Sequence, residues 1–70
     1  MSNWPSTKAK RVLRALLRMG WSIKHQRGSH IRFVHADRGE FTWAFHDDEE
    51  IGPRMLARIA KHTGLKPEDL

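Results

Sequence analysis

The stretch Arg27-Gly28-Ser29-His30-Ile31-Arg32-Phe33-Val34-His35 contains the pattern that decides the fold. Gly28 favours a tight turn because a residue without a Cβ atom tolerates backbone conformations that others resist. From His30 onward, polar and apolar side chains alternate, as in a β-strand with one buried face. The preceding segment, 21–27, also alternates. The sequence therefore predicts two antiparallel strands, 21–27 and 30–35, joined by this turn.

The phase of the first predicted strand does not fit a simple hairpin. A plain two-residue turn at Gly28-Ser29 would place Ile23 on the opposite face from Phe33, so we expect a three-residue loop or a β-bulge here. Side chains alternate along a strand, which sorts residues 21–26 into two sets. The predicted core side carries Trp21, Ile23 and His25, with His25 packing at the sheet edge, and the open side carries Ser22, Lys24 and Gln26.

A third strand is predicted at 40–45, where Phe41, Trp43 and Phe45 are in phase. The loop before it, Asp37-Arg38-Gly39, fits a three-residue hairpin with glycine at the position of positive φ. This loop pairs Ala36 with Glu40. Counting outward from that pair places Arg32 opposite Ala44 and His30 opposite His46.

Two amphipathic helices flank the strands. The first is predicted at 7–19, capped by Ser6 or Thr7 and ended by Gly20. The second begins at Gly52-Pro53 and ends at Gly64, and residues 67–70 add one helical turn. A loose leader, 1–5, precedes them. The result is a single α+β domain over 1–70 with the order α-β-β-β-α, in which a three-stranded antiparallel sheet carries both helices on one face. This architecture resembles the double-stranded-RNA-binding fold.

Composition limits the function classes. A chain of 70 residues buries only about 60% of its unfolded surface, which argues against a multi-step cofactor enzyme, and no cofactor is expected. With 13 Lys and Arg against 8 Asp and Glu, the net charge of +5 favours a polyanionic partner. No apolar run is long enough to span a membrane and no signal-peptide core is visible, so we expect a cytoplasmic protein without a membrane partner.

No metal site is expected. The chain has no cysteine, which excludes disulfides and thiolate ligands. His46 and the acidic run 47–50 offer suitable ligand types, but adjacent loop residues seldom converge on one ion. The acidic run is interpreted as a solvated loop.

His30 is the candidate catalytic residue. Histidine can accept or donate a proton near neutral pH. Lys24, Arg27 and Arg32 surround it in the sequence, together with Gly28 and Ser29 of the turn. A proton-transfer group among cations suits chemistry on a phosphodiester, although a histidine at a turn is more often only a solvated polar residue. His35 and His62 are interpreted as surface residues.

Several short motifs make the chain similar to the HicA toxins, a family of small mRNA interferases. These are Gly20-Trp21, Gly28-Ser29-His30, the run 42–46 (Thr-Trp-Ala-Phe-His), Gly52-Pro53, Ile59-Ala60-Lys61 and Gly64-Leu65. The chain departs from many members at Ile31, where a second histidine is common, and at Ala44, where proline is common. The resemblance implies a toxin that cleaves mRNA and halts translation, is neutralised by a HicB-type antitoxin, and depends on His30.

RNA supplies its own nucleophile, the 2′-hydroxyl, so a base need only remove its proton. His30 is predicted to be that base, Lys24 and Arg32 to stabilise charge on the phosphate with Arg27 nearby, and His46 is a candidate for protonating the leaving 5′-oxygen. Two alternatives remain open: a non-catalytic RNA-binding module, and an adaptor that binds proteins through Val34 and Ala44.

Overall fold

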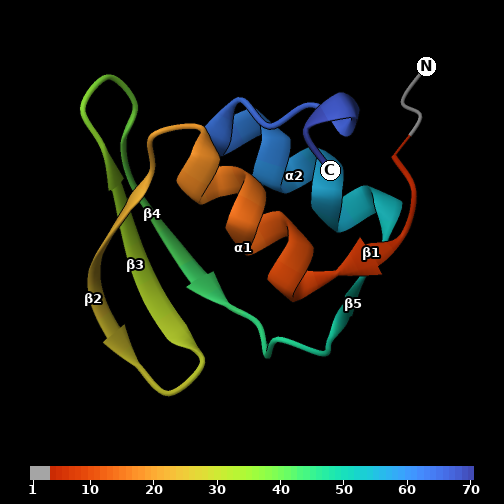
Figure 1. Ribbon diagram of the computed structural model, residues 1–70, viewed down its shortest axis with the longest axis horizontal. Coiled ribbons are helices and arrows are strands. Elements are labelled where there is room, and N and C mark those ends of the chain that lie inside the picture. The colour runs from red at the N-terminus through yellow and green to blue at the C-terminus, as the bar shows by residue number, and fades with distance from the viewer. Residues whose placement is uncertain (1–3) are drawn as a thin grey trace.

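Three antiparallel strands form a sheet, and both helices lie on the same side of it (Figure 1). The computed structural model describes residues 4–70; residues 1–3 of the predicted leader lie outside them. In chain order the elements are β1 (Thr7–Lys8), α1 (Ala9–Arg18), β2 (Ser22–Arg27), β3 (His30–His35), β4 (Gly39–Ala44), β5 (Glu50–Ile51), α2 (Pro53–Thr63) and the short 3-10 helix η1 (Pro67–Asp69). The α+β class and the order α-β-β-β-α are therefore confirmed.

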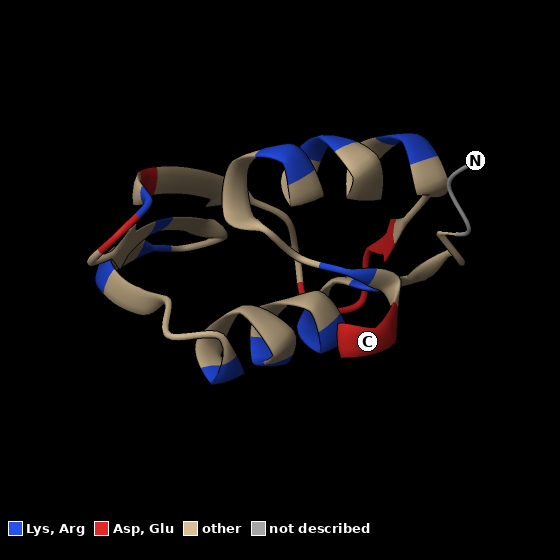
Figure 2. Ribbon diagram, turned by 90° about the horizontal axis from the view of Figure 1, so that it is seen from above, with Lys and Arg blue, Asp and Glu red and all other residues tan. Residues whose placement is uncertain are grey.

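The core lies between the sheet and the two helices. Leu16 of α1 and Leu56 of α2 are fully buried against the sheet residues Phe33 and Trp43, whose rings meet edge to face at 6.1 Å. Both helices carry their Lys and Arg residues on the side turned away from the other helix (Figure 2). Trp4, in the segment predicted as a loose leader, is half-buried and packs against this core.

The start of α1 differs from the prediction. The helix begins at Ala9 because the two residues before it are extended and pair with β5. Lys8 is the N-cap residue and makes no side-chain capping bond, so the predicted cap by Ser6 or Thr7 is wrong. The amide of Ala9 donates instead to the Glu49 carbonyl at 2.8 Å. The acidic run 47–50, predicted as a solvated loop, thus contacts the helix N-terminus, where negative charge is favourable.

Glycine ends each helix, as the sequence predicts. Gly20 (φ 101°) and Gly64 (φ 81°) adopt positive φ, which L side chains disfavour. Trp21, the residue just before β2, is bonded to the end of α1, because its amide donates to the Leu16 carbonyl at 3.1 Å. His35, predicted as a surface residue, is half-buried: its Nδ1 accepts from the Asp37 amide and its ring lies 5.1 Å from that of Trp21.

The β3–β4 pairing corrects the predicted register. His35 pairs with Gly39, so the hairpin loop is Ala36–Arg38, one residue earlier than expected. Every pairing therefore moves by two residues, and His30 lies opposite Ala44 rather than His46. A two-residue shift leaves each side chain on its predicted face, because side chains alternate with a period of two. The apolar pattern could fix the faces but not the register.

The β2–β3 hairpin contains the bulge that the phase conflict predicted. Its turn is Gly28-Ser29, and Gly28 has φ 62°, as the first central residue of a type II′ turn requires. The register shifts between Ile23, which pairs with Phe33, and His25, which pairs with Arg32. Lys24 is therefore the extra residue.

This bulge inverts the alternation in the second half of β2. Gln26 pairs with Ile31, whose side chain is buried on the helix side, while His25 shares a side with the exposed Arg32. The predicted orientations of His25 and Gln26 are thus wrong. Ile23 keeps its predicted side, but its residue is 43% exposed because it lies on the edge strand.

Candidate active site

The open face of the sheet is the side turned away from both helices. Cross-strand pairing arranges its residues in three rows across β2, β3 and β4: Ser22, Val34 and Glu40; His25, Arg32 and Thr42; Arg27, His30 and Ala44. The bulged Lys24 adds a fourth side chain from β2. The structure therefore brings His30, Arg27 and Arg32 together, as the sequence predicts, and adds His25.

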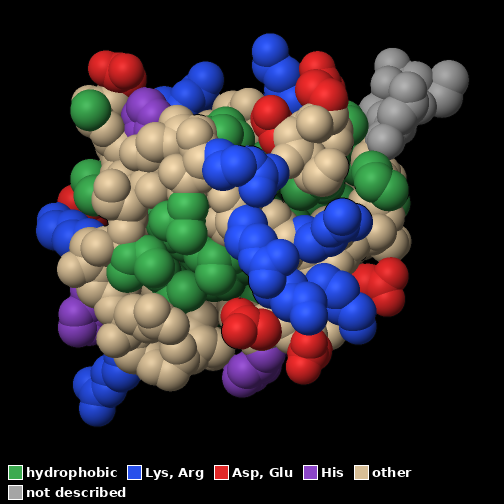
Figure 3. All heavy atoms as spheres, viewed as in Figure 1, with side chains coloured by type: hydrophobic (Ala, Val, Ile, Leu, Met, Phe, Trp, Pro, Cys, Tyr) green, Lys and Arg blue, Asp and Glu red, His purple; other side chains and the backbone are tan. Residues whose placement is uncertain are grey.

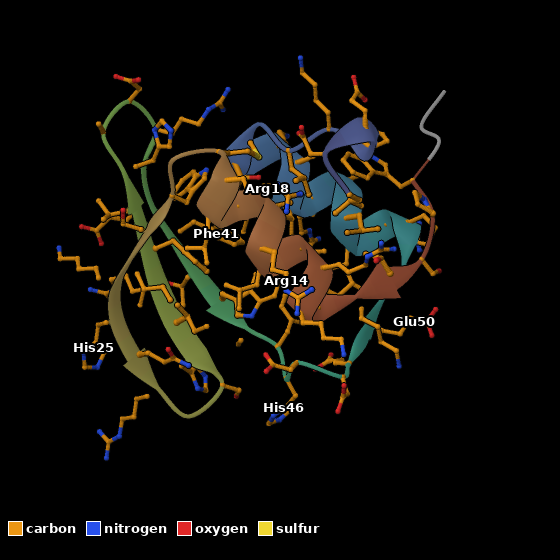
Figure 4. The ribbon with its side chains drawn as sticks, in the orientation of Figure 1. Arg14, Arg18, His25, Phe41, His46 and Glu50 are labelled. Carbon is orange, nitrogen blue, oxygen red and sulfur yellow. The ribbon has the colours of Figure 1, made fainter. Side chains whose placement is uncertain are left out.

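His30 begins β3 directly after the turn and is exposed. Its cross-strand partner is Arg27, and Arg32 follows on the same face. A pocket of about 300 Å³ opens here, lined by His25, His30, Ile31, Arg32 and Thr42. In Figure 4, His25 points outward from β2, away from the helices. The pocket thus combines two proton-transfer groups and a guanidinium in reach of solvent.

The carboxylate of Glu40 interacts with two of the cations predicted to bind phosphate, Lys24 and Arg32. Glu40 accepts a hydrogen bond from Lys24 Nζ at 2.9 Å, and its other oxygen lies 3.9 Å from Arg32 Nε. The Lys24 ammonium, first through this hydrogen bond and then through its charge, lowers the pKa of Glu40 below its usual value. Desolvation opposes this shift, and the charge of Arg32 adds the weakest lowering effect. Glu40 therefore stays ionised and partly neutralises the open face.

His46 does not join this group. It follows β4 and lines a different pocket, of about 340 Å³, together with Gln26, Gly28, Ser29, Ile31, Phe45 and Asp47. Gln26 belongs to the helix side of the sheet, whereas Ile31 borders both pockets. Figure 4 shows His46 pointing away from the chain after β4, far from the side on which His25 lies. The argument for His46 as a second catalytic group depended on the predicted register and does not hold.

Gly28 and Ser29 form the turn and line the pocket of His46, not the pocket of His30. Gly28 is exposed and Ser29 half-buried. A Cβ atom at Gly28 would meet no atom within 4 Å. The glycine is therefore required by its positive φ rather than by a close neighbour, and it fixes His30 at the start of β3.

Sequence reasoning missed two residues of the open face, His25 and Glu40. The phase conflict between Ile23 and Phe33 did predict a bulge, and placing it within β2 would have turned His25 to the open face. Nothing in the local sequence indicated that Glu40 would meet Lys24, because the contact spans β2 and β4 across the central strand.

Other surface features lie outside the open face. The exposed apolar residues Leu17 and Ile23 belong to α1 and the edge strand β2, and Figure 3 shows hydrophobic side chains gathered beside a band of Lys and Arg. Arg11, Arg14 and Arg18 of α1 line one basic pocket with Leu70.

Val34 is half-buried and Ala44 exposed, so the apolar area predicted for an adaptor on the open face is small.

Within residues 4–70, no three His, Asp or Glu residues are grouped so that they could hold a metal ion. In the same part of the chain, neither helix has the length and apolar character needed to cross a bilayer.

Comparison with known proteins places the chain in a family. A family model described as the HicA toxin of bacterial toxin-antitoxin systems matches residues 9–65, a range that contains α1, the three-stranded sheet and α2. No curated protein matches the chain significantly. The match covers most of the sequence and includes the motifs at Gly28-Ser29-His30 and Gly52-Pro53 that suggested the resemblance. The chain therefore belongs to the HicA toxin family of bacterial toxin-antitoxin systems.

Proposed function

We propose that this toxin is an endoribonuclease that cleaves mRNA on the open face of its sheet, with His30 as the general base. The observation that supports this best is the position of His30: it is exposed, opposite Arg27, and shares a pocket with Arg32. A neutral imidazole can remove the proton from an RNA 2′-hydroxyl. The guanidinium groups can stabilise the charge that develops on the phosphate.

The reaction needs no group beyond the protein and the RNA. The 2′-oxygen attacks the adjacent phosphorus, the bond to the 5′-oxygen breaks, and the products are a 2′,3′-cyclic phosphate and a 5′-hydroxyl. Arg27 and Arg32 contact phosphate oxygens, Lys24 can add a further contact when it is released from Glu40, and Gly28 and Ser29 let the backbone of the turn approach the RNA closely. The family implies a HicB-type antitoxin as the protein partner. Neutralisation would follow if that partner covers the open face.

The test compares purified wild-type protein with His30→Ala on an RNA oligonucleotide in the presence of EDTA. Loss of a general base lowers the rate by about 10²–10⁴-fold. The matched control is His62→Ala, which removes an exposed imidazole of α2 that stacks on Phe41. We expect the control to cleave at the wild-type rate and the wild-type products to end in cyclic or 3′-phosphate.

Cleavage by His30→Ala at the wild-type rate would disprove the proposed role of His30. A second function, a non-catalytic RNA-binding module, is supported by the exposed cations of the open face. It becomes the better interpretation if wild-type and His30→Ala proteins both bind RNA and neither cleaves it.

A further inference from the structure

We propose that His25 is the second catalytic residue, the acid that protonates the leaving 5′-oxygen. This inference rests on the proposed ribonuclease function and assigns the role that the observed register denies to His46. It follows from the bulge in β2. Because Lys24 is the extra residue, His25 turns from the helix side to the open face and pairs with Arg32.

The four residues nearest the turn form a square on the open face. His25 lies opposite Arg32, and Arg27 lies opposite His30. The imidazoles occupy one diagonal of the square and the guanidinium groups occupy the other. Directly opposed residues have Cβ atoms about 4.5–5.5 Å apart, whereas diagonal neighbours are about 7–8 Å apart. Both imidazoles line the same pocket, which they share with Arg32.

This diagonal spacing suits in-line phosphoryl transfer. The attacking and leaving oxygens lie on opposite sides of phosphorus, so base and acid must approach from opposite sides. Each needs a hydrogen bond of about 2.7–3.0 Å to its own oxygen. Two imidazoles in direct cross-strand contact would leave no room for a phosphate between them. A diagonal pair leaves that room. The other diagonal directs Arg27 and Arg32 toward the non-bridging oxygens.

Proton transfer also selects His25 among the residues of this pocket. A guanidinium remains charged and does not release its proton, which excludes Arg32, and a threonine hydroxyl such as that of Thr42 is a far weaker acid than an imidazolium. Histidine is the side chain suited to donate near neutral pH. In the step, His30 takes the 2′-proton as the O2′–P bond forms, and protonated His25 gives its proton to the 5′-oxygen as the P–O5′ bond breaks. Atoms and charges then balance without a further reactant.

The experiment uses two RNA substrates that differ in one atom. In the first, the scissile bond has its natural 5′-oxygen, and in the second a 5′-sulfur replaces it. A thiolate leaves without protonation, so the sulfur substrate does not need the acid. We expect His25→Gln to lower cleavage of the oxygen substrate by about 10²–10⁴-fold, and to cleave the sulfur substrate within about tenfold of the wild-type rate. His30→Gln should be impaired on both substrates, because both need the base.

His62→Gln is the matched control for loss of an exposed imidazole and should cleave both substrates as wild type does. Binding to a 2′-O-methyl RNA, which lacks the nucleophile, should be similar for wild type and His25→Gln. If His25→Gln is equally impaired on both substrates, His25 has a positioning role and the proposal is overturned. The proposal is also overturned if His25→Gln cleaves the oxygen substrate at the wild-type rate. If wild type cleaves neither RNA, the ribonuclease function itself fails, and the role of His25 fails with it.

Discussion

Replacing Glu40 by glutamine should strengthen RNA binding, because this carboxylate holds Lys24 at 2.9 Å and lies 3.9 Å from Arg32. Neutralising it frees Lys24 for a phosphate. The side chains of Lys24, Arg32 and Glu40 are 54%, 56% and 45% exposed, so the ion pairs contribute little to stability, and their effect is expected in binding. The matched control is Glu68→Gln, which makes the same charge change on η1.

The size of the effect follows from counterion release. If Arg27 and Arg32 alone contact phosphates in the wild type, two contacts give a slope of about −1.4 in log K against log salt for a single strand, and a third gives about −2.1. Between about 50 and 200 mM salt, wild-type affinity should then fall about 7-fold and that of Glu40→Gln about 18-fold.

The assay is fluorescence anisotropy with a labelled 2′-O-methyl RNA, which the protein cannot cleave by the proposed route. At low salt, Glu40→Gln should bind more tightly than wild type, and Glu68→Gln should follow the wild-type salt slope. An unchanged slope for Glu40→Gln, or an equal increase for both variants, would refute the placement of RNA on the open face.

Two further predictions test the binding face and the core. Arg32→Ala should weaken RNA binding and reduce the salt slope by about 0.7. Arg14→Ala, the same change on the outer side of α1 (Figure 4), should leave affinity and slope nearly unchanged in the same assay. The opposite result would place the RNA on α1. Phe33→Ala should cost about 3–5 kcal/mol, because Phe33 is fully buried and packs edge to face on Trp43. Ile23→Ala, at a 43% exposed site, should cost clearly less in urea unfolding monitored by circular dichroism, and equal losses would contradict the assigned burial.

Local patterns in the sequence determined the elements, because each depends on residues close together in the chain. Helical spacing of apolar residues predicted both helices, and Gly20 and Gly64 predicted where they end. Alternation predicted the three strands and which side of β3 and β4 is buried. The HicA motifs predicted the family that the comparison confirms, and through it His30 as the site residue, which remains a prediction.

Tertiary structure decided how those elements are aligned and which side chains meet. A shift of two residues preserves the buried face, so alternation alone could not decide whether His30 pairs with His46 or with Ala44. The N-terminus of α1 is satisfied by carbonyl groups some 40 residues away in the acidic run, a contact that no local capping rule describes.

On the open face, too, the sequence determined some features and only the folded structure determined others. The sequence contained the phase conflict that requires a bulge, but only the folded hairpin assigned it to Lys24 and so turned His25 toward His30's side of the sheet. The contact of Glu40 with Lys24 crosses the central strand. Chemical identity and element type are properties of short segments, whereas cross-strand neighbours depend on register, which the whole sheet and its packing against the helices determine.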